Sequence, residues 1–374
     1  MQRMDNEKVK LRKEGGIKKS PYCLISVLVS AICIYGLFLR FHGVGNRQYT
    51  IDEQYQLMQM KGSFLDMLKL LPNYEFCPYL SGDYYLVYPF FKLFGFNHWG
   101  LSIPHIAATL LAFYFLYLIC KQHFKTVWGY LITFTVVCFN ATLIWHAGEI
   151  RTYAVWPMLA LGVFYFSALL IENRDGISTA RKLAIYVFFT LVILFHVYGI
   201  MIFLASLLYQ VLTHIRSTDL RSFARDNFKF FLLVFCIVVP VWFLSVFGQH
   251  LAYRQDCRVF EFIPGPAENI VGFLKAVFGN LVGSRPLYFL LAGVFFPFIF
   301  PFKDRRNQIA LLLITVFLPI GLILISDLKT KYWFIQRQFI WVMPFFALYL
   351  GWVWDSLFVF SRNRLSKSKG ADCL

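Results

Sequence analysis

Long apolar runs constrain the fold of this chain more than any other feature of its sequence. They recur along nearly its whole length and contain few charged side chains. The runs lie at 22–39, 101–119, 126–145, 152–171, 183–213, 230–248, 287–302, 308–326 and 338–360. Because a helix of about 20 apolar residues crosses the hydrocarbon core of a bilayer, the pattern predicts an all-α, polytopic membrane protein.

The composition excludes several other classes of protein. Hydrophobic residues make up 59% of the 374 residues and charged residues 15%. A soluble domain has about 45–50% apolar and about 25% charged residues. Together with a mean hydropathy of +0.60, these values exclude a disordered chain, a collagen-like fibre and a typical soluble enzyme.

The net charge of +16 is concentrated between the apolar runs. Six short segments hold 23 of the 36 Lys and Arg residues. These segments are 1–20, 121–125, 172–182, 214–229, 303–306 and 361–369. An excess of Lys and Arg is typical of cytoplasmic loops, so the charge is explained without a nucleic-acid partner.

The run 183–213 is too long for a single crossing. As one helix it would extend about 46 Å, against a hydrocarbon core of about 30 Å. Its flanks, 172–182 and 214–229, are both basic and are both expected in the cytoplasm. We therefore predict two helices with a turn near 196–199. The whole chain then has about ten transmembrane helices, with both ends in the cytoplasm.

The predicted organisation is one membrane domain between two cytoplasmic tails. The tails are residues 1–21 and 361–374, and the single transmembrane domain covers 22–360. The first run leads into Phe41-His42-Gly43 rather than a small-residue cleavage site, so it is expected to be an uncleaved span. Interfacial helices are expected in the first outer loop, 41–100, and in the late outer loop, 249–286.

The first outer loop carries an acidic pair. Thr50 and Glu53 form a capping-box pattern, which predicts a helix from Ile51. Asp52 would then lie in the first helical turn, where the helix dipole favours the carboxylate form. Either both acids only start the helix, or Asp52 faces a cavity and acts as a catalytic general base. Since Glu53 has the clearer structural role, we predict Asp52 as the base.

A second group of candidate site residues lies between the third and fourth runs. Glu149 and Arg151 are expected at the membrane surface, with His146 and Tyr153 beside them. Charges there are costly unless they are paired, solvated or facing a cavity. The two residues form a local ion pair, or they contribute charge to a site for an anionic ligand.

Basic residues of the later outer loops are the remaining candidates. Arg254, Lys331 and Arg337 are predicted on the same side of the membrane as Asp52. A single arginine at a helix end is usually an anchor, but several on one face would bind a phosphate group. His196 lies within an apolar run, where a packed histidine is commoner than a ligand-binding one.

The sequence contains no recognisable metal or cofactor motif. Its eight cysteines include no CxxC or Cys/His metal spacing. Cys77 and Cys257 both fall in predicted outer loops, and nothing in the pattern decides whether they pair. Nucleotide-binding, metalloprotease and serine-hydrolase motifs are absent. We therefore predict no metal site and no cofactor.

The ordered set of motifs resembles the membrane glycosyltransferases of the glycosyltransferase-C superfamily. More narrowly, it resembles the branch of the protein O-mannosyltransferases and the bacterial aminoarabinose transferase of lipid A. The resemblance is carried by Ile51-Asp52-Glu53, the aromatic segment leading to Phe94-Gly95, the Glu149–Tyr153 junction and Gln336-Arg337-Gln338. Where relatives have a His-Pro-Pro-Leu-like segment, this chain differs, with Cys77-Pro78-Tyr79-Leu80.

The resemblance implies a sugar donor on polyprenyl phosphate and an acidic base that maps onto Asp52. We therefore expect an inverting glycosyltransferase that moves a hexose or pentose to a hydroxyl of a glycan, lipid or protein acceptor. The reaction is expected on the non-cytoplasmic face of a bacterial inner membrane. The alternatives are a polytopic transporter or lipid flippase, and a polysaccharide ligase or polymerase. Acids at one membrane face and no visible internal repeat favour the transferase over the transporter.

Overall fold

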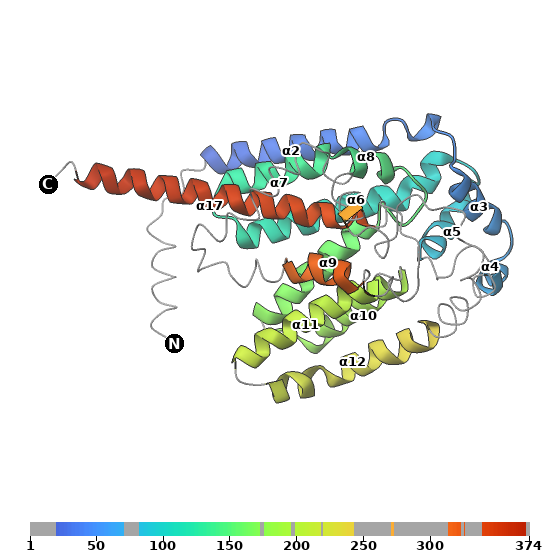
Figure 1. The fold of residues 1–374 in the computed structure, drawn as a ribbon. Helices are drawn as coiled ribbons and strands as arrows, with labels where there is room; N and C mark the ends of the chain where they lie inside the picture. The colour runs from blue at the N-terminus through green and yellow to red at the C-terminus, as the bar shows by residue number, and fades with distance from the viewer. Residues whose placement is uncertain are drawn as a thin grey trace.

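The computed structural model describes most of the chain. The described residues are 20–70, 82–172, 176–195, 199–217, 220–242, 271–272, 313–322, 325 and 339–371. Every regular element among them is a helix (Figure 1). The predicted all-α fold class is confirmed.

The helices differ widely in length. They are α2 (Ser20–Phe41), the 3-10 helix η1 (Val44–Asn46), α3 (Ile51–Gln59), α4 (Phe64–Leu70), α5 (Gly82–Phe94), α6 (His98–His123), α7 (Val127–Phe139), α8 (Ala141–Ala147), α9 (Trp156–Glu172), α10 (Thr179–Phe195), α11 (Gly199–Ser217), α12 (Leu220–Trp242) and α17 (Val342–Ala371). A further short apolar helix covers Leu313–Leu322.

The long helices form two packed groups joined by α9. In the first group α7 packs against both α2 and α17, and α6 lies beside them. In the second group α10 packs against α11 and α12. Because α9 contacts both α6 and α11, it connects the groups, while α3, α4 and α5 gather at one end of the bundle (Figure 1).

Three described helices are long and apolar enough to cross a membrane: Ser26–Asn46, His98–His123 and Val342–Arg362. Helices α7 and α8 form a fourth candidate as a bent pair. The apolar parts of α9, α11 and α12 are shorter. The chain is thus a multi-pass membrane protein, and the count of ten spans and the limits of its cytoplasmic tails stay predictions.

The apolar run 126–145, counted as one span from the sequence, forms two helices in the structure. Helices α7 and α8 meet at an angle of 53° on either side of Asn140. The Asn140 side-chain oxygen accepts a hydrogen bond from the Leu143 N–H at 2.9 Å and so caps a new helix. Asparagine at this position favours a helix start over continuation of the preceding helix.

The prediction of two helices within 183–213 is confirmed. Helix α10 ends at Phe195 and α11 begins at Gly199, and the two helices pack against each other. A Cβ atom at position 199 would collide with the backbone carbonyl of Val192. The first position of α11 therefore requires glycine, the residue without a Cβ.

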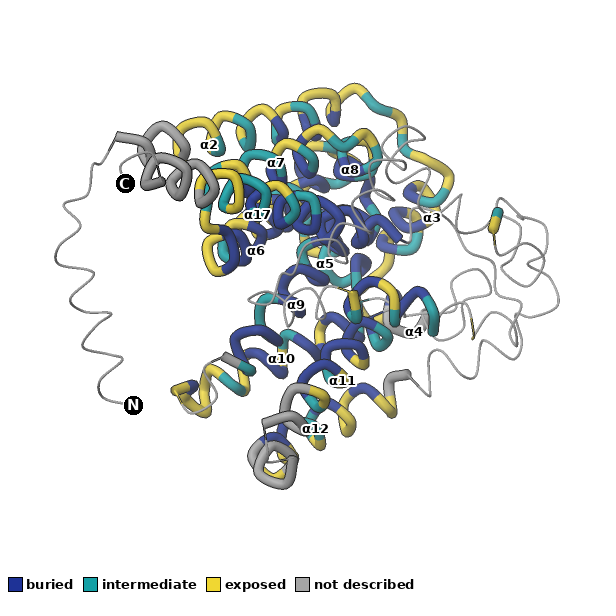
Figure 2. The backbone as a smooth tube through the Cα atoms, turned by 60° about the vertical axis from the view of Figure 1, so that its left-hand side comes forward, coloured by how far each residue is buried: buried dark blue, intermediate teal, exposed yellow. Residues whose placement is uncertain are grey.

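Apolar side chains fill the interior of the bundle and also cover its outside. Buried positions run through the middle, from α6 and α17 to α9 and α10 (Figure 2). Trp156 and Trp341 are among the largest fully buried side chains. Tyr114, Leu191 and Phe235 are exposed on outer faces. Helices that are apolar all round are typical of a membrane environment.

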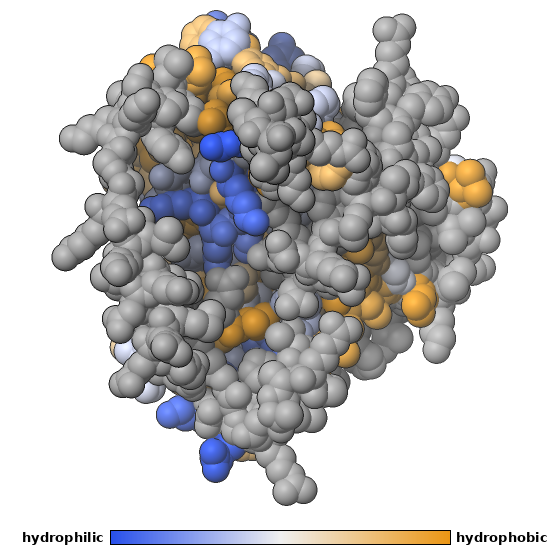
Figure 3. All heavy atoms as spheres, turned by 90° about the vertical axis from the view of Figure 1, so that its left-hand side faces the viewer, coloured by the Kyte–Doolittle hydropathy of each residue, from blue (hydrophilic) through white to orange (hydrophobic). Residues whose placement is uncertain are grey.

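The two ends of the bundle differ in character. The last turn of α6, with the exposed Lys121, and the connection to α7, with the exposed Lys125, lie at the end from which α17 extends. Seen from that end, hydrophilic side chains gather in a patch between hydrophobic ones (Figure 3). Helices α3, α4 and α5 of the first predicted outer loop lie at the opposite end (Figure 1). The two segments thus lie at opposite ends of the bundle, and their placement on opposite sides of the membrane stays a prediction.

Candidate active site

The predicted capping box at the start of α3 is confirmed. The Glu53 N–H donates to the Thr50 hydroxyl oxygen, and the Thr50 N–H donates to Glu53 Oε2 at 2.8 Å. The Glu53 side chain is fully buried and forms an ion pair with Arg47. Its Oε1 also accepts the Ile150 N–H at 2.5 Å. Glu53 therefore joins α3 to the turn between α8 and α9.

Asp52 lies beside Glu53 in the first turn of α3, but its surroundings differ. Its side chain is partly exposed, whereas that of Glu53 is buried and bonded at both oxygens. Both carboxylates lie where the positive end of the helix dipole stabilises negative charge. Of the two, Asp52 is the one that a solvent-borne hydroxyl group can approach.

The turn between α8 and α9 holds the second group of candidates. Glu149 is buried, and its Oε1 lies 3.0 Å from His146 Nδ1. The rings of His146 and Tyr153 lie 5.6 Å apart. Arg151 is half-buried, and its Nη1 donates to Gln56 Oε1 on α3 at 3.4 Å. The structure thus brings the start of the helix that bears Asp52 close to the turn that bears Glu149 and Arg151.

Three buried polar residues extend this site and were not identified from the sequence. Gln56 Nε2 donates to Asp83 Oδ2 at 2.7 Å, and His105 Nε2 lies 3.0 Å from Asp83 Oδ1. All three side chains are fully buried, on α3, α5 and α6. Ionisable residues within apolar helices usually pair with one another. The presence of His105 inside the apolar run 101–119 therefore indicated a buried polar contact. The sequence alone did not show which residue is its partner.

The outer edge of the site contains tyrosines with raised pKa values. Burial, and secondly the nearby Glu53 carboxylate, raise the pKa of Tyr49 to about 12. The Tyr49 hydroxyl donates to the Phe96 carbonyl at 2.7 Å. Burial also raises the pKa of Tyr85 on α5 to about 12. Both phenols therefore stay neutral at physiological pH, and that of Tyr49 acts as a hydrogen-bond donor.

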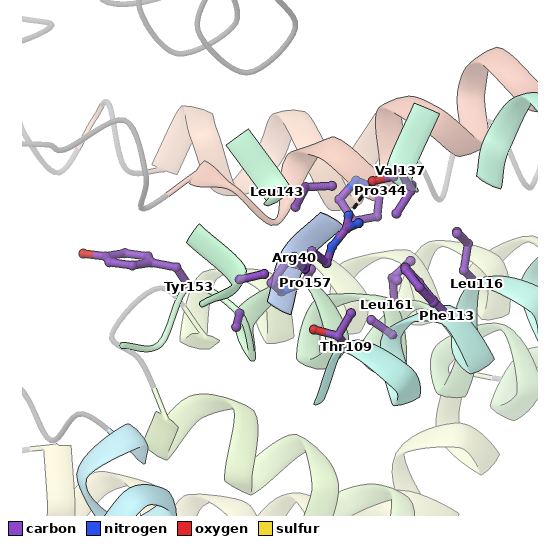
Figure 4. A pocket seen from close by; sticks show the side chains of 13 residues that line it. Arg40, Thr109, Phe113, Leu116, Val137, Leu143, Tyr153, Pro157, Leu161 and Pro344 are labelled. Carbon is purple, nitrogen blue, oxygen red and sulfur yellow. Dashed lines mark hydrogen bonds between the residues drawn. The ribbon is translucent and has the colours of Figure 1, made fainter. Parts of the chain in front are cut away.

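An apolar pocket borders the site. The pocket is small, with a cavity volume of about 30 Å³, and it lies between α2, α6, α7, α8, α9 and α17. Arg40 lies in its wall and donates to the carbonyls of Val137 and Cys138 at 2.6 and 2.9 Å (Figure 4). Since α7 ends at Phe139, these are carbonyls that the broken helix leaves without a helical partner. Tyr153 belongs to both the pocket and the turn between α8 and α9, so the two are contiguous.

Other candidates lie outside the described residues, so their predicted roles are untested. They are Arg254, Lys331, Arg337, His196, Cys77 and Cys257. Within the described part of the chain, no group of three or more His, Cys, Asp or Glu side chains could hold a metal ion.

Comparisons with known proteins agree with the resemblance seen in the motifs. Residues 83–243 match the model of a family described as dolichyl-phosphate-mannose-protein mannosyltransferase. Among curated protein sequences, none matches the chain significantly.

The fold is similar to that of ArnT from Cupriavidus metallidurans, a lipid A aminoarabinose transferase. The apo structure of ArnT matches with a TM-score of 0.58 and 14% identity over 95% of this chain. The structure of ArnT bound to undecaprenyl phosphate matches with a TM-score of 0.56 and 14% identity over 96%. The chain covers 64% of the ArnT chain in both cases. At this identity the likeness shows the fold, and it confirms the glycosyltransferase-C architecture that the motifs indicate.

Proposed function

We propose that this protein is an integral-membrane glycosyltransferase that uses a polyprenyl-phosphate-linked sugar. The matched family is described as dolichyl-phosphate-mannose-protein mannosyltransferase. One of the similar structures is that of ArnT bound to undecaprenyl phosphate. Both lipids are isoprenoid phosphates. The proposed acceptor is a hydroxyl of a glycan, lipid or protein, and the proposed location is the outer face of a bacterial inner membrane.

The observation that carries the proposal is the junction between Glu53 and Ile150. Asp52 precedes Glu53 in the chain, and Arg151 follows Ile150. The bond between Glu53 and Ile150 therefore brings a carboxylate and a guanidinium group to neighbouring positions at one end of the bundle. A general base and a cation for an anionic leaving group are what transfer from a lipid phosphate requires.

In the proposed mechanism Asp52 accepts the proton of the acceptor hydroxyl. The acceptor oxygen attacks the anomeric carbon from the face opposite the phosphate, which inverts the configuration. The bond between the anomeric carbon and the phosphate oxygen breaks, and polyprenyl phosphate leaves as an anion. Arg151 and Arg337, with Arg254 and Lys331 as further candidates, stabilise the charge that develops on the phosphate. The mechanism uses no metal and no cofactor.

Two other features of the site support the binding of a lipid-linked donor. The pocket beside Tyr153 is lined mainly by apolar side chains, among them Phe113, Leu116 and Leu161. Such a wall suits isoprenyl groups, while the phosphate and sugar stay at the polar end near Arg151. The buried Glu149 and the half-buried His146, 3.0 Å apart, add polar groups next to this boundary.

The test is donor cleavage by the purified full chain in liposomes. A polyprenyl-phosphate sugar labelled in the sugar is supplied with a mixture of hydroxyl acceptors, and free polyprenyl phosphate is measured. Release of the lipid phosphate together with a labelled acceptor supports the transferase. Movement of the intact donor between leaflets without cleavage would identify a flippase, and would contradict the proposal.

A further inference from the structure

A chain of polar contacts runs from the interior of the bundle to Arg151. His105 on α6 contacts Asp83 on α5, Asp83 accepts from Gln56 on α3, and Gln56 accepts from Arg151. Four separate elements thus meet in one network. Its members come from positions far apart in the sequence, so tertiary packing alone brings them together.

The network fixes the orientation of the Gln56 amide. The Asp83 carboxylate has donors at both oxygens, His105 Nε2 at 3.0 Å and Gln56 Nε2 at 2.7 Å. Because a carboxylate accepts hydrogen bonds and does not donate them, the NH₂ group of Gln56 must face Asp83. The carbonyl oxygen of the same amide then faces Arg151. An amide not held in this way could present either group.

The contact from Gln56 orients the Arg151 guanidinium without cancelling its charge. A carboxylate at this place would neutralise the arginine, whereas the amide oxygen is uncharged. At 3.4 Å the contact is long for a hydrogen bond, so its contribution to stability is small. A guanidinium that is already oriented loses less conformational freedom when it binds a phosphate.

We propose that Gln56, Asp83 and His105 are positioning residues that direct the Arg151 guanidinium toward the phosphate of the donor. This inference rests on the proposed function, in which Arg151 binds that phosphate. The three residues do not touch the donor. They act through Arg151, so their effect on catalysis must disappear when Arg151 is absent.

A double-mutant cycle tests this dependence. Gln56→Met keeps the length of the side chain and removes its hydrogen-bonding groups. Arg151→Leu and the double variant complete the cycle, all as full chains in liposomes. We expect Gln56→Met to raise the donor KM by about 3–10-fold, and to have less than about a twofold further effect in the Arg151→Leu background.

The matched control is Gln54→Met. Gln54 lies on the same helix, is exposed, and donates to the Tyr49 carbonyl rather than to Asp83. This variant should leave the donor KM unchanged. Thermal unfolding in detergent establishes that each variant is folded before its kinetics are compared.

A second pair of variants covers the case in which Gln56→Met fails to fold. His105→Gln places an amide N–H where His105 Nε2 now donates to Asp83, and His105→Leu removes the donor. We expect the donor KM to rise with His105→Leu and to stay near the wild-type value with His105→Gln. A purely structural role would change stability in these variants without this selective change in KM.

The outcomes separate the two proposals. Suppose that Arg151→Leu raises the donor KM. If Gln56→Met then leaves the donor KM unchanged, or if the fold-changes of the two single variants multiply fully in the double variant, the positioning role is wrong and the proposed function stands. If Arg151→Leu leaves the donor KM unchanged, Arg151 does not bind the phosphate and the positioning role falls with it. If the wild-type protein releases no polyprenyl phosphate, the proposed function itself is wrong.

Discussion

The buried carboxylate of Glu53 accepts the backbone N–H of Ile150 at 2.5 Å, across 97 positions of sequence. This bond joins the first turn of α3 to the turn between α8 and α9. The neighbours in the chain, Asp52 and Arg151, are carried to the same end of the bundle. Glu53, which has a structural role in the capping box, thus positions the neighbouring Asp52, which we propose as the catalytic base.

Replacing Asp52 by asparagine should abolish most turnover. The amide keeps the shape of the side chain but cannot accept the proton of the acceptor, and loss of a general base costs about 10²–10⁴-fold. Donor binding and thermal stability should change little, because Asp52 is partly exposed. Near-wild-type turnover of purified Asp52→Asn would remove this residue from the role of base.

Replacing Glu53 by glutamine should show the opposite pattern. The variant loses the negative charge that pairs with Arg47 and weakens the bond from the Ile150 N–H. Weakening the hydrogen bonds of a buried carboxylate whose arginine partner is partly exposed costs about 1–3 kcal/mol. We expect a clear drop in the unfolding temperature with a smaller loss of turnover, per folded molecule, than in Asp52→Asn. Equal stability of the two variants would contradict the structural role of Glu53.

Local patterns predicted much of the fold. The start of α3 was predictable because Thr50 and Glu53 carry out the capping within four consecutive residues. The hairpin of α10 and α11 was predictable because run length and flanking charge are also local properties. The bend at Asn140 was not predicted, since apolar composition does not separate a straight helix from a broken one.

The site was less predictable than the fold. Gln56 and Asp83 lie 27 positions apart, and Asp83 and His105 lie 22 apart, on three different helices. No spacing rule relates such positions, so only packing reveals the network. The sequence did mark the acidic pair and the Glu149–Tyr153 junction. It could not indicate that a bond from Glu53 to Ile150 brings these two segments together.

The predicted topology places the α10–α11 hairpin with both ends in the cytoplasm. Reporter fusions at Asp175 and Arg221 should therefore both give a cytoplasmic signal, and a fusion at Gln255 should give an outer-side signal. The reason is that basic segments flank the hairpin on both sides. An outer-side signal at Arg221 would show that 183–213 crosses the membrane once.

Replacing Arg151 or Arg337 by leucine should weaken donor binding and slow transfer. Arginine stays charged and can bind two phosphate oxygens at once, so lysine at either position should restore only part of the activity. The competing explanation is that each arginine only anchors its helix end at the membrane surface. If both leucine variants bind and use the donor normally, the phosphate site lies elsewhere, and the 249–286 loop becomes the leading candidate.

Asp355 offers a test of stability at the other end of the bundle, away from the proposed chemistry. This fully buried residue of α17 accepts the Thr126 N–H at 2.5 Å and the Lys125 N–H at 3.1 Å. The Asp355 carboxylate thus satisfies the N–H of Thr126, the N-cap residue of α7, and that of the preceding Lys125. We expect Asp355→Ala to lower the free energy of unfolding by about 1–3 kcal/mol. The stability of Asp355→Asn, which keeps one acceptor oxygen, should lie between that of Asp355→Ala and that of the wild type.

Thermal unfolding in detergent measures the stability of both Asp355 variants, and their turnover per folded molecule should stay unchanged. A stability of Asp355→Ala equal to that of the wild type would show that this capping contact contributes nothing to the packing of α17 on α7.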